Sequence, residues 1–134
     1  MKTGKHIGKV LGELETEIME IVWGAEKPIS VSNVFKVLNK KREIAYTTVM
    51  TVMGRLAEKS LLKRTLSGKA YLYIPTFSKD TFLTRVSKQI VQNLVNNFGD
   101  RAIAHFAEEL DKIPTGKKRE LLKMLGKVKN NERE

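Results

Sequence analysis

The stretch "AYTTVMTVMGRLAEKSLLKRTLSGKAYLYIP", residues 45–75, changes its hydrophobic pattern part-way along, and that change decides the fold. In its first part, apolar residues recur at spacings of three and four, as on the buried face of a helix. They are Val49, Val52, Met53 and Leu56. In its second part, apolar and polar residues alternate on both sides of Ser67-Gly68, which is a turn signal. We therefore expect a helix followed at once by a β-hairpin that ends at Pro75.

Two further helices are predicted before this stretch. Apolar residues at helical spacing predict the first helix over Glu13–Trp23, with Gly24 ending it. Pro28 interrupts helical structure, and Ser30 is well placed as the N-cap of a second helix within residues 31–41. Three short helices followed by a basic hairpin describe a winged helix-turn-helix.

The last third of the chain predicts three more amphipathic helices. Ser78 is the expected N-cap of a fourth helix that ends at Gly99, Asp100 of a fifth and Thr115 of a sixth. A protein this small has too little core of its own to bury the apolar stripes of these helices. We therefore expect a second copy of the chain to bury them in a symmetric dimer. The expected dimer contacts are Phe82, Leu83, Val86, Ile90, Leu94, Phe106, Leu110, Leu121 and Leu125. The predicted fold is mainly α with a small β-hairpin: a winged-helix DNA-binding domain, 1–77, and a helical dimerisation region, 78–134.

The charge balance points to a polyanionic partner. The 134 residues carry 25 lysines and arginines against 15 aspartates and glutamates, a formal net charge of +10. A small protein with this excess is attracted to polyanions, of which nucleic acid is the commonest. Four glutamates within residues 13–20 leave the rest of the first 77 residues strongly basic. We expect one face that meets phosphates and another that avoids them.

Residue types that are missing narrow the function further. The absence of cysteine excludes disulfides, zinc-thiolate sites and thiol nucleophiles. The apolar runs are far shorter than a membrane span, and the basic N-terminus lacks the apolar core of a signal peptide. We expect a soluble cytoplasmic protein without membrane insertion.

The outer face of the predicted third helix is rich in hydroxyls. The second helix of a helix-turn-helix enters the major groove, and its N-terminal residues reach base edges. Threonine offers a hydroxyl to bases or phosphates and a methyl group to thymine. The alternative interpretation of Thr47, Thr48 and Thr51 is that their hydroxyls cap the helix locally or belong to solvated surface. The predicted DNA contacts are Tyr46, Thr47, Thr48, Thr51, Arg55, Lys63, Ser67 and Lys69.

Two of these cations have competing interpretations. Arg55 either binds phosphate or pairs with an acidic residue of the first helix, and the sequence leaves both open. Lys69, at the hairpin tip, is either a phosphate or minor-groove contact or solvated turn charge, and the first is favoured because a wing straddles the DNA backbone.

Catalytic and metal sites find little support. The glycines near the N-terminus lack the pattern of a phosphate-binding loop, and no Ser/His/Asp constellation is identifiable. His6 and His105 lie far apart in sequence. His105 has Glu108 and Glu109 at helical spacing, which allows a metal-sensing hypothesis, but a solvated or partly buried helix residue is the favoured interpretation. We expect no enzyme, cofactor or bound metal.

Three segments carry a resemblance to a known family. "LGELETEIMEIVW" at 11–23, "AYTTVMTVMGRLAEKSLL" at 45–62 and "KAYLYIP" at 69–75 resemble the penicillinase-repressor family, which includes the β-lactamase and methicillin-resistance repressors. The resemblance implies a homodimeric repressor of inverted-repeat operators that dimerises through its C-terminal helices. It also implies base contacts from the third helix, Arg55 near the DNA and the Ser67–Lys69 turn as the wing.

The resemblance also implies two routes of regulation. Copper-responsive members carry a cysteine-rich tail, which this chain lacks. The β-lactamase type is cleaved at an Asn-Phe bond after a membrane sensor-protease detects antibiotic, and "NNFGD" makes Asn97-Phe98 the candidate bond. An Asn-Phe pair at a helix end also needs no protease to explain it. A different class of function, a winged-helix module that binds an acidic protein partner, stays open beside the repressor.

Overall fold

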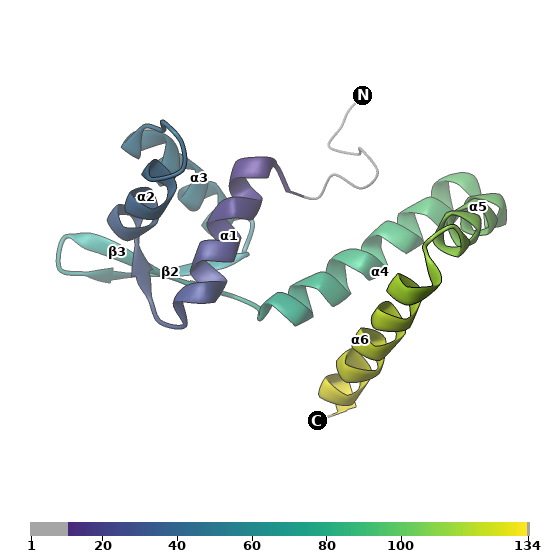
Figure 1. The fold of residues 1–134 in the computed structure, drawn as a ribbon. Helices are drawn as coiled ribbons and strands as arrows, with labels where there is room; N and C mark the ends of the chain where they lie inside the picture. The colour runs from purple at the N-terminus through teal and green to yellow at the C-terminus, as the bar shows by residue number, and fades with distance from the viewer. Residues whose placement is uncertain (1–10, 134) are drawn as a thin grey trace. The chain divides into compact units, whose positions relative to one another are not determined.

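The computed structural model describes residues 11–133, in which six helices and three strands follow one another along the chain. Figure 1 shows them: α1 Glu13–Ala25, β1 Ile29–Ser30, α2 Val31–Asn39, α3 Tyr46–Glu58, β2 Leu62–Ser67, β3 Ala70–Pro75, α4 Lys79–Phe98, α5 Asp100–Asp111 and α6 Thr115–Arg133. The chain divides into two compact units, Met1–Phe82 and Leu83–Glu134. The first unit is a winged helix-turn-helix, which confirms the predicted fold class.

The sheet of the first unit has one strand that the sequence pattern does not predict. Its order is β1-β3-β2, all antiparallel, with Ile29 opposite Tyr73. In the hairpin, Ser67 still belongs to the strand and pairs with Ala70, so the loop is the two-residue turn Gly68-Lys69, one residue later than the predicted Ser67-Gly68. Gly68 has a φ of +64°, a conformation that glycine adopts without steric cost.

The core of the first unit lies where α1, α2 and α3 pack together and against the sheet. Tyr73 and Leu62 bring the hairpin base into this core. The predicted buried face of α3 is confirmed for Val49, Met53 and Leu56, whereas Val52 is half-buried at its edge. The other buried members are Ile18, Met19, Val22, Ile29, Val31, Val34 and Leu38.

Helix ends agree with the sequence only in part. Ser30 caps α2 as predicted, because its hydroxyl accepts a 3.1 Å hydrogen bond from the Asn33 N–H. The prediction that Gly24 ends the first helix is wrong: α1 continues to Ala25, and Glu26 takes the left-handed C-cap position with a φ of +57°. The predicted caps Asp100 and Thr115 are instead the first residues of α5 and α6.

The first turn of α4 belongs to the first unit. The Trp23 indole N–H donates a 2.9 Å hydrogen bond to the Phe77 carbonyl, and the rings of Trp23 and Phe82 lie 5.4 Å apart. Ser78 caps the helix through the Thr81 N–H. Phe82, expected among the dimer contacts, is only 8% exposed, because its ring is covered within its own unit.

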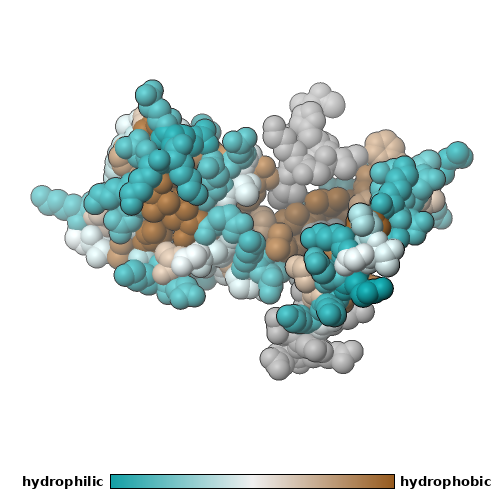
Figure 2. Space-filling view, viewed as in Figure 1, coloured by the Kyte–Doolittle hydropathy of each residue, from teal (hydrophilic) through white to brown (hydrophobic). Residues whose placement is uncertain are grey.

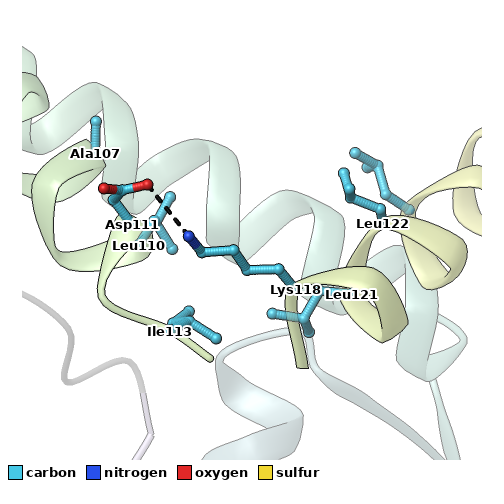
Figure 3. A pocket seen from close by; sticks show the side chains of 8 residues that line it. Ala107, Leu110, Asp111, Ile113, Lys118, Leu121 and Leu122 are labelled. Atoms are coloured by element: carbon cyan, nitrogen blue, oxygen red, sulfur yellow. Dashed lines mark hydrogen bonds and ion pairs between the residues drawn. The ribbon is translucent and has the colours of Figure 1, made fainter. Parts of the chain in front are cut away.

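The second unit contains the rest of α4 with α5 and α6, and it leaves much apolar surface uncovered. Figure 2 shows apolar residues gathered along α4, and no residue of α5 is buried. A groove of about 370 Å³ lies between α5 and α6 (Figure 3). Its lining is mostly apolar: Ala107, Leu110, Ile113, Leu121, Leu122 and Leu125, with Asp111 and Lys118 as an ion pair at 3.2 Å. None of the described helices combines the length and the hydrophobicity that a membrane span needs.

Candidate nucleic-acid interface

Helix α3 presents a hydroxyl-rich face away from the core. Its periodicity separates the buried residues from Thr47, Thr48 and Thr51, which are all exposed in the first two turns. Met50 lies on the same outer face and is 47% exposed. Tyr46 is also exposed, and its ring packs edge-on against Phe35 with centroids 5.6 Å apart. The outer face therefore offers hydroxyls, methyl groups and one apolar side chain to a ligand.

The start of α3 lacks a side-chain cap. Ala45 occupies the N-cap position and has no side chain able to accept from the first-turn N–H groups. Within residues 11–133, the hydroxyls of Thr47, Thr48 and Thr51 make no hydrogen bond, so local capping does not account for them. The Thr48 N–H donates to the Ala45 carbonyl at 3.1 Å. The N–H groups before it and the positive end of the helix dipole favour an anion such as phosphate.

Three glutamates of α1 form ion pairs with cations from other parts of the first unit. Lys59 pairs with Glu15 at 2.9 Å, and Lys79 pairs with Glu20 at 2.9 Å. Arg42 forms the third pair, with Glu17. The acidic helix thus neutralises cations that stand near it and leaves the cations of the hairpin to other partners.

Glu15 has the most constrained carboxylate of α1. Burial alone raises the pKa of Glu15, but the hydrogen bond from the Gly12 N–H and the contact with Lys59 outweigh it, so the pKa falls below its usual 4.5. The charge of Arg55 lowers the pKa of Glu15 further. Among the described residues Arg55 forms no ion pair with the first helix, although its field reaches Glu15, and its exposed guanidinium can meet a phosphate.

The hairpin carries its own cations beyond the core. Lys63, Ser67 and Lys69 are exposed, and in the described part of the chain neither lysine has an ion-pair partner. Lys69 stands at the tip, in the two-residue turn. Strand β2 also packs against α3, so the structure brings the predicted hairpin and helix residues into one unit.

Sequence reasoning left one cation of the hairpin, Arg64, out of the predicted DNA contacts. Arg64 is exposed, its guanidinium lies 4.6 Å from the centre of the Tyr71 ring, and it donates a long 3.5 Å hydrogen bond to the Tyr73 hydroxyl. Strand alternation was the signal that could have singled out Arg64. Arg64 lies on the same side of β2 as the buried Leu62, whereas Lys63 lies on the opposite side.

The residues expected in the dimer lie on surfaces that are wholly or partly exposed, except for Phe82. Val86, Ile90 and Leu94 are half-buried. The exposed members are Leu83, Phe106, Leu110, Leu121 and Leu125. Each of these five side chains keeps 38–47% of its surface exposed.

The candidate cleavage bond and the metal hypothesis can also be placed. Asn97 and Phe98 form the last turn of α4, Phe98 is 62% exposed, and Gly99 follows with a φ of +76°. His105 lies 3.6 Å from Glu108 on the exposed face of α5. Among the described residues there is no group of three or more potential metal ligands. His6 lies outside the described residues.

Comparison with known proteins identifies the family. The model of the penicillinase repressor family matches residues 11–127. The chain belongs to the penicillinase repressor family. Its relatives in this family are transcriptional regulators and repressors and not enzymes, so the protein is classed as a transcriptional repressor.

Individual relatives of the penicillinase repressor family agree with this match. The transcriptional regulator BlaI of Mycobacterium tuberculosis is 33% identical over 102 residues, which cover 75% of this chain and 73% of BlaI. The penicillinase repressor of Staphylococcus aureus is 26% identical over 115 residues, which cover 84% of this chain and 90% of the relative. A solution structure of the DNA-binding domain of the repressor BlaI matches with a TM-score of 0.47 and 27% identity, covering 56% of this chain and 89% of that domain.

Proposed function

We propose that this chain represses transcription by binding an inverted-repeat operator as a homodimer. The single observation that carries the proposal is the outer face of α3, where exposed threonine hydroxyls have no partner among the described residues and the helix start is uncapped. In this account Thr47, Thr48 and Thr51 meet base edges in the major groove. The hairpin lies along the backbone, with Lys63, Ser67 and Lys69 near phosphates.

A competition experiment tests DNA binding against the alternative of an acidic protein partner. Binding to a labelled duplex from upstream of the protein's own gene is measured by fluorescence anisotropy, with unlabelled competitors added. The proposal expects the upstream duplex to compete far better than random-sequence DNA or polyglutamate. Equal competition by random DNA and the upstream duplex contradicts operator binding, and stronger competition by polyglutamate supports the protein-interaction module.

Dimerisation in this proposal uses the apolar surface of the second unit. The exposed side chains of α5 and α6, together with the groove between these helices, form a surface that a second copy can bury. Two linked half-site contacts then bind far more tightly than one, because the second binds at a high effective concentration. Occupation of the operator blocks the promoter.

Sedimentation equilibrium measures this association directly. The wild-type chain is expected at the mass of two copies. Leu121→Lys places a charge on the exposed apolar face of α6 and is expected to shift the equilibrium toward the monomer. Gln92→Lys adds the same charge to an exposed position of α4 and serves as the matched control. A wild-type protein that remains monomeric at micromolar concentration rules out the homodimer.

Release by proteolysis is the regulatory part of the proposal. A membrane sensor-protease is proposed to cut between Asn97 and Phe98, which removes α5 and α6 from the DNA-binding unit. Three features support this bond: it lies in the last helical turn, Phe98 is exposed, and Gly99 follows with a positive φ of +76°. The last carbonyls of a helix lack helical partners, so this turn opens at low cost.

Co-expression with the sensor-protease that this proposal requires, with and without a β-lactam, tests the cleavage. Mass spectrometry is expected to find a fragment that ends at Asn97 when the operator is derepressed. The Asn97→Ala protein is expected to remain uncleaved and therefore to stay bound to the operator. A derepressed culture in which the chain remains intact contradicts the proteolytic route while leaving operator binding unaffected.

A further inference from the structure

The outer face of α3 has no side chain at Gly54, and Arg64 of strand β2 lies beside this position. Gly54 follows Thr47 by seven residues and Thr51 by three, so it shares their face of the helix. A Cβ atom built at Gly54 would lie 3.9 Å from the Arg64 Nη1 atom. The guanidinium of Arg64 therefore stands beside the third turn of α3, at the place where a side chain of α3 would begin.

Contacts within the hairpin hold Arg64 at this place. Arg64 is directly opposite Tyr73 in the strand register and diagonal to Tyr71. The Tyr71 ring lies under the guanidinium at 4.6 Å, and the buried Tyr73 provides the hydroxyl acceptor. These contacts raise the pKa of Arg64, mainly through the Tyr73 hydroxyl, and Glu58 contributes through its charge without forming an ion pair. Arg64 is a cation fixed at the joint of helix and hairpin.

We propose that Arg64, held by Tyr71 and Tyr73 beside Gly54, binds a phosphate of the DNA backbone next to α3. The inference rests on the proposed DNA binding and adds to it a contact that comes from the strand β2 and not from α3. The planar guanidinium donates two parallel hydrogen bonds to a phosphate, and a side chain already held in place loses less entropy when it binds.

The position along α3 favours a phosphate over a base. In this motif the N-terminal residues of the recognition helix reach the bases, and here those are Thr47, Thr48 and Thr51. Gly54 lies further along the helix, nearer the end that leaves the groove. A phosphate contact adds affinity that does not depend on sequence and that weakens as salt rises.

The test compares the salt dependence of DNA binding for the unaltered protein and four variants. Arg64→Gln removes the charge, Arg64→Met keeps an apolar stem over Tyr71, and Arg64→Lys keeps the charge without the planar fork. Lys88→Gln removes one exposed charge from α4 and is the control. Each is measured on the upstream duplex and on random-sequence DNA, with circular dichroism melts to establish folding.

Loss of one phosphate contact lowers the slope of log K against log salt by about 0.9 per subunit. The unaltered protein binds DNA more tightly than Arg64→Gln or Arg64→Met. Between about 50 and 200 mM salt, this difference in affinity shrinks by about 3.5-fold per subunit, equally on both duplexes. Arg64→Lys keeps the slope with weaker binding, and Lys88→Gln matches the unaltered protein.

Three results overturn the inference. A folded Arg64→Gln or Arg64→Met protein with an unchanged slope shows that Arg64 serves the hairpin alone. A loss confined to the upstream duplex shows base reading instead of phosphate binding. An unaltered protein that binds neither duplex removes the proposed function itself, and this inference with it.

Discussion

The threonines at the start of α3 allow a prediction in which folding and binding change in opposite directions. The double variant Thr47→Ala/Thr48→Ala removes two exposed hydroxyls that make no hydrogen bond within the described chain. Folding loses no hydrogen bond of the described chain and gains helix propensity, about 0.5 kcal/mol for each threonine replaced by alanine, or about 1 kcal/mol in total. For a unit of this size the melting temperature rises by roughly 4–8 °C.

Operator binding is expected to fall in the same variant. A hydrogen bond to a base or phosphate contributes about 1 kcal/mol net, and two hydroxyls in each of two subunits give about 4 kcal/mol. That loss corresponds to roughly a 1,000-fold weaker complex. Thermal melts and anisotropy titrations on the upstream duplex measure the two effects in the same preparation.

The control for this variant is Thr16→Ala on α1. Thr16 is exposed, and its hydroxyl donates to the Gly12 carbonyl, so its loss tests a threonine outside the proposed interface. We expect its operator affinity to equal that of the unaltered protein. A Thr47→Ala/Thr48→Ala protein that is more stable and binds with unchanged affinity refutes the reasoning, because the hydroxyls would then be ordinary solvated surface.

Three further predictions concern the first unit. Phe82→Ala removes a ring that is 8% exposed and packed on Trp23, so it should lower the free energy of unfolding by about 3 kcal/mol, measured by urea titration; a loss below 1 kcal/mol contradicts this packing. Gly54→Ala places a methyl group in ordinary contact with Arg64 at 3.9 Å, so the melting temperature should rise through helix propensity, and a fall contradicts the space described there. Glu15 has a lowered pKa in the folded chain, so its stabilising effect is present above its unfolded value near 4.5 and is lost as pH falls through the folded value. The difference in unfolding free energy between the unaltered protein and Glu15→Gln should therefore shrink in acid, and a difference independent of pH contradicts it.

The elements that the sequence predicts well are those specified by local patterns. Helix α3 and the hairpin follow from a change of period at Leu62, and the tight turn follows from Gly68, whose φ of +64° suits glycine. The cap at Ser30 has a local cause as well, because its hydroxyl reaches an N–H only three residues away.

The features missed by sequence analysis depend on residues far apart in the chain. Strand β1 has two residues, too short for any period, and exists because Ile29 and Ser30 pair with β3. The first helix continues past Gly24 because Trp23 and Ala25 pack on the core, which outweighs the weak helix propensity of glycine.

The candidate site divides in the same way. The outward face of α3 is predictable, since helical period alone separates Thr47 and Thr51 from Val49 and Met53. The role of Arg64 is not, because it needs the strand register that sets it opposite Tyr73 and the packing that brings it beside Gly54. Its partners come from two elements whose relation no local pattern encodes.

Hydroxyl-radical footprinting of the upstream DNA tests the central claim most directly. A homodimer that reads an inverted repeat through α3 is expected to protect two patches on each strand, with centres about 34–36 Å apart and related by two-fold symmetry. Under the same conditions, Thr47→Ala/Thr48→Ala is expected to give no protection. A single asymmetric patch, or no protection at concentrations that saturate the anisotropy signal, contradicts the account.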